Sequence, residues 1–214
     1  MENKEEKGWE GAIDRLSNII SWVLVPLMMP LYATLLVFHL SVLQFSSVQV
    51  KWSFSLIIFC MTAIIPMLLV ILMKRFGIVQ DLGLNGRRER FYPYIITILS
   101  LGAAGWFMLS KNAPLWSGMF FFGGAAAGVI NLLINFRWKI SAHAAAMAGV
   151  IALLIAISRE NIPHPSIDLW IVGAILLAGL LGSARVWLGR HTVMQVLAGS
   201  AVGFLSVFLL TLAA

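Results

Sequence analysis

The chain has 214 residues, of which 60% are hydrophobic and only 11% are charged. A soluble domain carries roughly 25% charged residues. This composition therefore excludes a soluble enzyme, a disordered linker and a nucleic-acid-binding domain, although the formal net charge is +6. The single cysteine, Cys60, also excludes a disulfide framework and a cysteine-rich metal site. We expect an integral membrane protein.

The first twenty residues predict a helix that lies at the membrane surface. Trp9, Ile13, Leu16 and Ile20 are spaced four, three and four positions apart among charged residues, which is typical of an interfacial amphipathic helix. The segment lacks the cationic start and the small-residue cleavage site of a signal peptide, so we expect it to be retained. We treat residues 1–20 as this interfacial segment and residues 21–214 as one transmembrane domain.

The rest of the chain is divided into apolar stretches that are long enough, or nearly long enough, to cross a membrane. A spanning helix needs about 20 largely apolar residues. Seven stretches approach this length: Ser21–Phe45, Ser55–Leu72, Tyr92–Leu109, Trp116–Phe136, Ala142–Ile157, Leu169–Leu181 and Thr192–Leu212. The fifth and sixth are short unless they extend into their polar flanks. The expected fold is an all-α transmembrane bundle of six or seven spans.

Pairs of small residues four positions apart occur in three of these stretches. Such pairs let helix backbones approach closely. We expect them to pack helices within one bundle rather than to form a dimer interface. The pairs are Gly124/Gly128, Ala178/Gly182 and Gly199/Gly203.

Positive charge is concentrated on one side of the predicted bundle. With seven spans, twelve of the fifteen lysines and arginines share a side with the N-terminus, and only Lys51, Lys111 and Arg159 lie opposite. The positive-inside rule would make the basic side cytoplasmic. Residues that bind phosphate should not be counted in that rule, so the charge distribution leaves open the direction in which this side faces.

Three basic segments fall on that side. The first is DLGLNGRRERFYPY, in which Arg87, Arg88 and Arg90 stand just before a span. Guanidinium groups match phosphate oxygens in bidentate fashion, so this cluster predicts an anion site. The alternative is a membrane anchor that holds the span end at the interface.

The second segment places Lys139, Ser141 and His143 at the start of a span, where helix N–H groups favour an anion. A histidine entering an apolar helix can instead be a packed core residue. The third segment contains Arg185, Arg190, His191 and Gln195. Because His191 and Gln195 are four apart, they can share one helix face and form a hydrogen bond. The alternative for the glutamine is a polar contact between helices.

The combination of the three segments is more specific than any one of them. Two spans separate each segment from the next, so an even number of crossings brings all three to the same membrane face. Two histidines, a serine and several arginines at one face suit phosphoryl transfer without a metal. The arginines would neutralise the phosphate, one histidine would attack phosphorus, and the other would protonate the leaving oxygen.

With these three segments, the sequence resembles the type-2 phosphatidic acid phosphatase family, whose members are membrane lipid phosphatases related to vanadium haloperoxidases. That family carries the motifs K-x6-R-P, P-S-G-H and S-R-x5-H-x3-D. The third motif matches as Arg185-x5-His191-x3-Gln195, with glutamine in place of aspartate. The second survives as Ser141-Ala142-His143, and the first is reduced to RRERFYP. The resemblance covers roughly residues 74–203.

The resemblance implies a role for each of these residues. His191 would be the nucleophile that forms a phosphohistidine, oriented by Gln195, and His143 would be the general acid. Phosphate would be bound by Arg185, Ser141, Arg87, Arg88, Arg90 and Lys139, the last as a substitute for the missing lysine of the first motif. We expect no metal, no cofactor, no nucleic acid and no obligatory protein partner. The expected partners are a lipid phosphate substrate and the lipids of a bacterial inner (plasma) membrane.

Three functions remain in competition. The first is a metal-independent phosphatase acting on an isoprenoid diphosphate, phosphatidic acid or phosphatidylglycerol phosphate. The second is a lipid phosphotransferase, in which an alcohol instead of water resolves the phosphohistidine. The third is a catalytically silent lipid-binding or transport protein that keeps the basic pocket, because Gln195 adds no charge to the imidazole that it orients.

Overall fold

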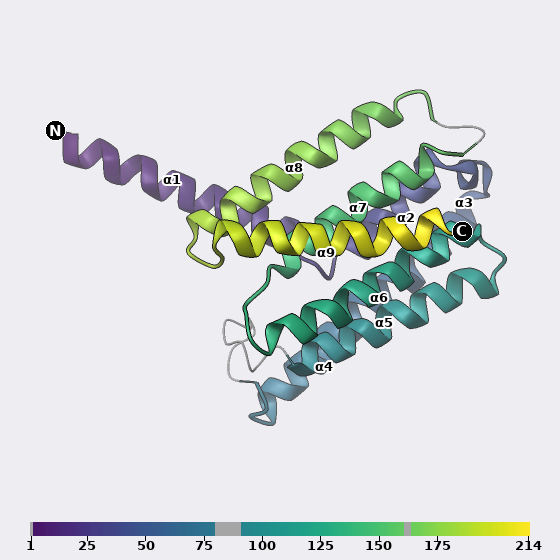
Figure 1. Ribbon diagram of the computed structural model, residues 1–214, viewed down its shortest axis with the longest axis horizontal. Coiled ribbons are helices and arrows are strands. Elements are labelled where there is room, and N and C mark those ends of the chain that lie inside the picture. Colours follow the sequence, from purple (N-terminus) through teal and green to yellow (C-terminus); the bar gives the residue numbers. More distant parts are fainter. Residues whose placement is uncertain (1, 80–90, 161–163) are drawn as a thin grey trace.

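The computed structural model describes residues 2–79, 91–160 and 164–214, with side chains from residue 8 onward. Within these residues every regular element is a helix, and most of the helices run along one common direction (Figure 1). The elements in chain order are α1 (Glu2–Val23), α2 (Met29–Leu40), η1 (Val42–Phe45), α3 (Val48–Phe59), η2 (Cys60–Ile64), α4 (Ile65–Arg75), α5 (Phe91–Ser110), α6 (Leu115–Asn135), α7 (Ala142–Ile157), α8 (Ile167–Trp187) and α9 (Val193–Leu212). The prediction of an all-α protein is confirmed for the described part of the chain.

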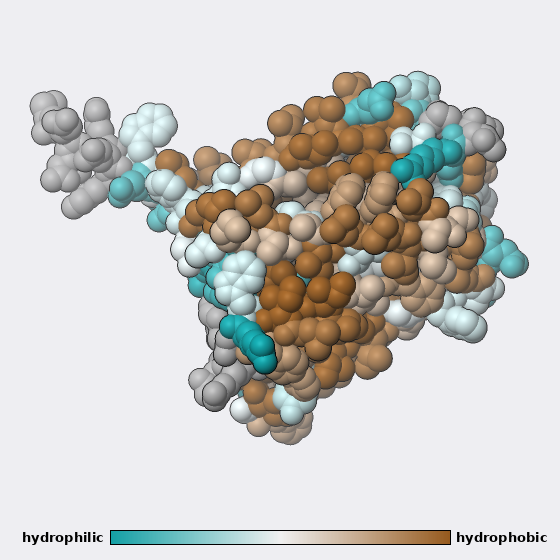
Figure 2. Space-filling model, in the orientation of Figure 1, coloured by the Kyte–Doolittle hydropathy of each residue, from teal (hydrophilic) through white to brown (hydrophobic). Residues whose placement is uncertain are grey.

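Five helical segments of the described chain are long and apolar enough to cross a membrane. One is the run α3–η2–α4 (residues 48–75), and the others are α5, α6, α8 and α9. α2 and α7 are apolar but shorter. Figure 2 shows hydrophobic side chains covering the flank of the bundle, with hydrophilic residues gathered toward its ends. The protein is an integral membrane protein, and the count of six or seven spans stays a prediction.

Three of the predicted stretches have different bounds in the structure. The stretch Ser55–Leu72 lies within a longer helical run, because α3 already begins at Val48 and α4 ends at Arg75. The stretch Ser21–Phe45 is not one helix, because α1 continues to Val23 and α2 begins only at Met29. Pro26 and Pro30 lie in and just after the break, and proline removes a backbone donor and disfavours helix in the residue before it. The stretch Leu169–Leu181 is shorter than the helix that contains it. α8 extends to Trp187 and has Arg185 in its last turn.

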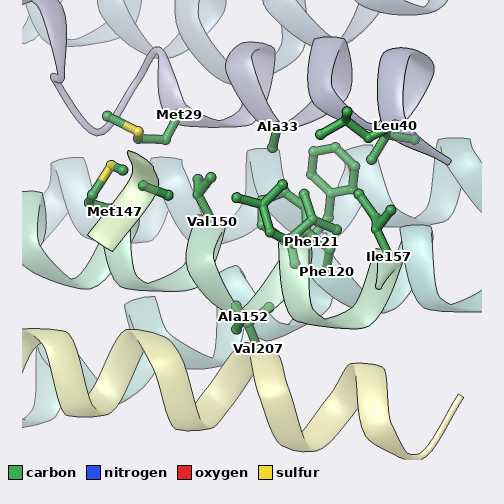
Figure 3. Packing of buried hydrophobic residues seen from close by; sticks show 14 of the residues in the cluster. Met29, Ala33, Leu40, Phe120, Phe121, Met147, Val150, Ala152, Ile157 and Val207 are labelled. Carbon is green, nitrogen blue, oxygen red and sulfur yellow. The ribbon is translucent and has the colours of Figure 1, made fainter. Parts of the chain in front are cut away.

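The central helix of the bundle is α7. Its sequence, AHAAAMAGVIALLIAI, is apolar on every side, as expected for a helix surrounded by others, and eleven of its sixteen residues are buried. It packs against α9, α8, α6 and α2. Figure 3 shows Met29 and Leu40 of α2 on one side of α7 and Val207 of α9 on the other. The helix that begins at Ser141 is therefore held from several sides.

The contact between α7 and α9 is made by backbone. A Cβ atom built on Gly199 would overlap the carbonyl oxygen of Ser141, and one built on Gly203 would overlap the carbonyl oxygen of Ala145. The other small-residue pairs also pack within the chain. A Cβ on Gly128 would lie 2.8 Å from Ile98 of α5, and one on Gly182 would lie 3.0 Å from Val196 of α9. The prediction that these pairs pack helices inside one bundle is confirmed.

We predict that Gly203→Ala destabilises the protein by about 1–3 kcal/mol or more, because the added methyl group must displace the backbone of α7. Gly179→Ala on α8 is the matched control, since nothing lies within 4 Å of its added Cβ. Thermal unfolding in detergent, followed by the loss of the monodisperse peak in size-exclusion chromatography, measures the difference. Equal midpoints for the two variants would contradict the backbone contact.

Candidate active site

The start of α9 carries a capping box. The hydroxyl of Thr192 accepts a hydrogen bond from the Gln195 backbone N–H at 3.3 Å, and Gln195 Oε1 accepts one from the Thr192 N–H at 3.3 Å. This reciprocal pair satisfies two donors that a helix start leaves without partners. It also fixes the position of the Gln195 amide group beside the residue that precedes the cap.

That residue is His191, whose side chain is only 6% exposed. Its Nδ1 lies 3.1 Å from Gln195 Oε1. Since an amide oxygen only accepts hydrogen bonds, Nδ1 carries the hydrogen, and in the neutral ring the lone pair is then on Nε2. The imidazole is therefore held in the tautomer that presents a nucleophilic Nε2.

The reason for the His191–Gln195 contact differs from the one predicted. His191 is not on the helix, because α9 begins after the cap residue Thr192. The two side chains meet because the capping box folds the glutamine back over the helix start. Thr192 is not among the residues predicted for the site, although Thr-x-x-Gln ahead of an apolar run is a recognisable capping-box signature.

A second local motif joins Arg185 to His191. The N–H of Gly189 donates to Val186 O at 2.9 Å, and the N–H of Arg190 donates to Arg185 O at 3.1 Å. With Gly189 at φ +62°, this is a Schellman ending of α8. The His191 N–H also donates to Arg185 O, at 3.2 Å. The five-residue spacing between arginine and histidine is thus the length of one helix ending. Arg185 lies in the last turn of α8, beyond the predicted end of that span at Leu181.

Ser141 connects this segment to α7. It is completely buried and caps the helix, accepting the Ala144 N–H on its hydroxyl at 3.3 Å. Its own N–H donates to the Gln195 carbonyl oxygen at 3.2 Å. The Ser141 O–H group remains a donor. The starts of α7 and α9 are consequently bonded to each other, and both direct N–H groups toward the same end of the bundle (Figure 1).

His143 lies in the first turn of α7 and is half-buried. Its Nε2 lies 3.3 Å from the backbone oxygen of Ser21, near the end of α1. The participation of α1 at this place was not foreseen, because a backbone oxygen leaves no signal in the sequence. Lys139 is half-buried two residues before Ser141. Arg87, Arg88 and Arg90 lie outside the described residues.

The electrostatics of this end favour an anion. Residues 136–143 and 184–195 contain Arg137, Lys139, Arg185 and Arg190 and no aspartate or glutamate, and α1 adds one carboxylate, Asp14, beside Trp187. Two helix N-termini add partial positive charge. Within the described chain, no group of three or more histidine, cysteine, aspartate or glutamate side chains could hold a metal ion. The arrangement provides positive groups that can neutralise a phosphate.

The remaining two histidines lie at the opposite end of the bundle. The rings of His39 and His164 are 5.5 Å apart, and His39 also packs against Trp170. Nearby, Glu160 accepts the Val42 N–H at 2.9 Å. Burial raises the pKa of the Glu160 carboxyl group above its usual value, against the lowering effect of this hydrogen bond. None of these residues belongs to the candidate site.

The candidate site joins two helix starts, which carry Ser141, His143 and His191, to the helix ending that carries Arg185, and this set of residues is suited to phosphoryl transfer. The chain belongs to the PAP2 superfamily, whose sequence profile matches residues 55–214. This membership confirms the resemblance to type-2 phosphatidic acid phosphatases and indicates a phosphatase acting on phosphate esters. No curated protein and no solved structure matches the chain.

The two roles of the Gln195 amide can be separated by mutation. Gln195→Ala should lower the turnover of an aryl phosphate by about 100-fold or more, because the His191 tautomer is no longer fixed. Thr192→Ala should cost about 0.5–2 kcal/mol of stability through the lost cap while changing turnover by only about threefold. Gln195→Glu is the matched control, since glutamate serves both the cap and the histidine. Equal losses of turnover in Gln195→Ala and Thr192→Ala would show that the amide acts only through the cap.

Proposed function

We propose that the protein is a metal-independent membrane phosphatase that removes phosphate from a lipid phosphate or diphosphate through a phosphohistidine. The observation that carries this proposal is the buried His191. Its Nδ1 donates to Gln195, and its backbone N–H donates to the Arg185 carbonyl oxygen at the end of α8. An imidazole held in one tautomer beside positive groups is the arrangement that nucleophilic catalysis on a phosphate requires.

In the first step, His191 Nε2 attacks phosphorus and the bond from phosphorus to the leaving oxygen breaks. His143, as the imidazolium, gives a proton to that oxygen, so a neutral lipid alcohol or a protonated lipid phosphate departs. Arg185, Lys139, the Ser141 hydroxyl and the arginines Arg87, Arg88 and Arg90 bind the oxygens that stay on phosphorus. The product of this step is a phosphohistidine and a neutral His143.

In the second step, water attacks the phosphohistidine. His143 now accepts a proton from the water, the N–P bond breaks, and inorganic phosphate leaves with both histidines restored. Gln195 supplies a neutral acceptor where the family has a carboxylate. It therefore preserves the orientation of His191 but stabilises the cationic ring less than aspartate would.

The surroundings of the site support a lipid substrate. The candidate site lies at the end of a bundle whose flank is apolar (Figure 2). An apolar groove of about 370 Å³ runs between α6 and α9, lined by residues that include Ala126, Ile130, Ala201 and Leu205. Ala201 is six residues beyond Gln195, or about 9 Å along the helix. We assign this groove to the acyl or isoprenyl chain of a substrate whose phosphate is at His191.

The N-terminal helix is proposed to contact the membrane surface. Trp9, Leu16, Ile19 and Val23 of α1 are 53% to 73% exposed. Its polar residue Ser17 is instead buried against the protein, at 5% exposure. Because α1 buries a small polar residue and leaves these large apolar side chains exposed, it is suited to a lipid environment. The proposed location remains a bacterial inner (plasma) membrane.

We predict that His191→Ala abolishes phosphate release while leaving the protein folded. The assay uses purified protein with isoprenoid diphosphate, phosphatidic acid and phosphatidylglycerol phosphate, in the presence of a metal chelator. Turnover within tenfold of the wild type would contradict the nucleophile, because the loss of a covalent nucleophile costs several orders of magnitude. Transfer of phosphate only to an added alcohol would identify a phosphotransferase, and binding without turnover would identify a silent binding protein.

We predict that His143→Ala affects substrates according to their leaving groups. A lipid alcohol needs a proton when it departs, so turnover of phosphatidic acid should fall by about 10²–10⁴-fold. An activated aryl phosphate leaves without a proton, so the release of its aryl alcohol in the first step should fall much less. Single-turnover release of the leaving group from the two substrates, measured with the same preparation in excess over substrate, gives the comparison. Equal losses on both would remove the general-acid assignment.

A further inference from the structure

The end of α1 supplies an acceptor to the candidate site. The last carbonyl groups of a helix have no partner within the helix. In α1, the Ile20 oxygen accepts the Leu24 N–H at 2.9 Å and the Val23 oxygen accepts the Tyr32 hydroxyl at 3.0 Å. The Ser21 oxygen faces His143 Nε2 at 3.3 Å. Because a carbonyl oxygen only accepts, this nitrogen carries a hydrogen that it donates to α1.

A second bond ties α1 to the segment that contains the other histidine. The Trp187 indole N–H donates to the Asp14 carboxylate at 2.8 Å. Trp187 is the last residue of α8, two positions after Arg185 and four before His191. Ser17 lies between Asp14 and Ser21 along α1. Both serines are buried, at 5% and 6% exposure, so α1 packs closely through small side chains. One helix therefore bonds to both histidine-bearing segments.

We infer that α1 is a positioning element of the active site, which holds His143 through the Ser21 carbonyl oxygen. The inference rests on the proposed role of His143 as the general acid. An imidazolium has two N–H groups, and the one on Nε2 is given to Ser21. The proton for the leaving oxygen then comes from Nδ1. The C-terminal end of a helix carries partial negative charge, which stabilises the protonated ring before the proton is transferred.

This contact is outside the part of the chain that defines the superfamily. The match begins at residue 55, whereas Asp14 and Ser21 precede it. The N-terminal helix thus supplies His143 with an acceptor from outside the matched segment. Residues before position 55 consequently contribute to the rate of the reaction and not only to membrane attachment.

The test displaces α1 without changing a residue of the proposed phosphate site. Ser17→Leu inserts a larger side chain into the buried strip between α1 and the bundle, and Ser17→Ala is its matched control. Asp14→Leu removes the acceptor for Trp187, and Asp14→Asn keeps an oxygen there. Each variant is assayed in full-length protein on phosphatidic acid and on an aryl phosphate. Folding is checked by size-exclusion chromatography and thermal unfolding.

We expect Ser17→Leu and Asp14→Leu to lower turnover of phosphatidic acid by about 10- to 100-fold, a part of the contribution of a general acid. Single-turnover release of the aryl alcohol should change by less than about threefold, because this first step needs no proton. Ser17→Ala should behave as the wild type. In a His143→Ala background, Ser17→Leu should cause no further loss on phosphatidic acid, because the group that it displaces is already absent.

Three results would overturn the inference. Equal losses on both substrates, or a further loss in the His143→Ala background, would show a general structural role for α1. An increase in turnover would show that Ser21 holds His143 away from the substrate. No change on either substrate would show that α1 is dispensable. If His143→Ala lowers the rates on both substrates equally, the general-acid role of His143 in the proposed function is wrong. This result differs from the three above, which concern α1 alone.

Discussion

The contact on which the rest of this structure depends is the backbone approach of α7 to α9. Gly199 and Gly203 let the two helices come so close that no Cβ atom fits between them. At the end of this contact, the Ser141 N–H reaches the Gln195 carbonyl oxygen. Without that approach, the serine of one motif and the histidine of the other would stand on separate helices with side chains between them.

The candidate site is built almost entirely from the ends of helices. Two capped N-termini, one Schellman ending and the last carbonyl groups of α1 meet at one end of the bundle. The physical reason is that a membrane interior cannot stabilise isolated charges or unpaired backbone groups. Helix ends place N–H groups, basic side chains and histidines near the interface, where an anionic headgroup is also found.

The position of Gln195 shows how a substitution in a motif can preserve local structure. The N3 position of a capping box, three residues after the cap, is commonly glutamate or glutamine. The amide oxygen of glutamine has two lone pairs. One accepts the Thr192 N–H and the other accepts His191 Nδ1. The geometry of the histidine is kept, and only the charge behind it is lost. The electrostatic support of His191 must then come from other groups at this end of the bundle.

The sequence by itself determined the membrane class, the apolar helices, the small-residue packing and the three basic segments, because these follow from composition and from short-range spacing. It also identified the superfamily, since Arg185-x5-His191 is a local pattern. It did not determine the break around Pro26 or the full length of α8. Only the tertiary structure decided that the Ser21 oxygen faces His143 and that Asp14 bonds to Trp187. Such contacts join residues 122 and 173 positions apart. They depend on how whole helices pack and on backbone atoms that every residue shares.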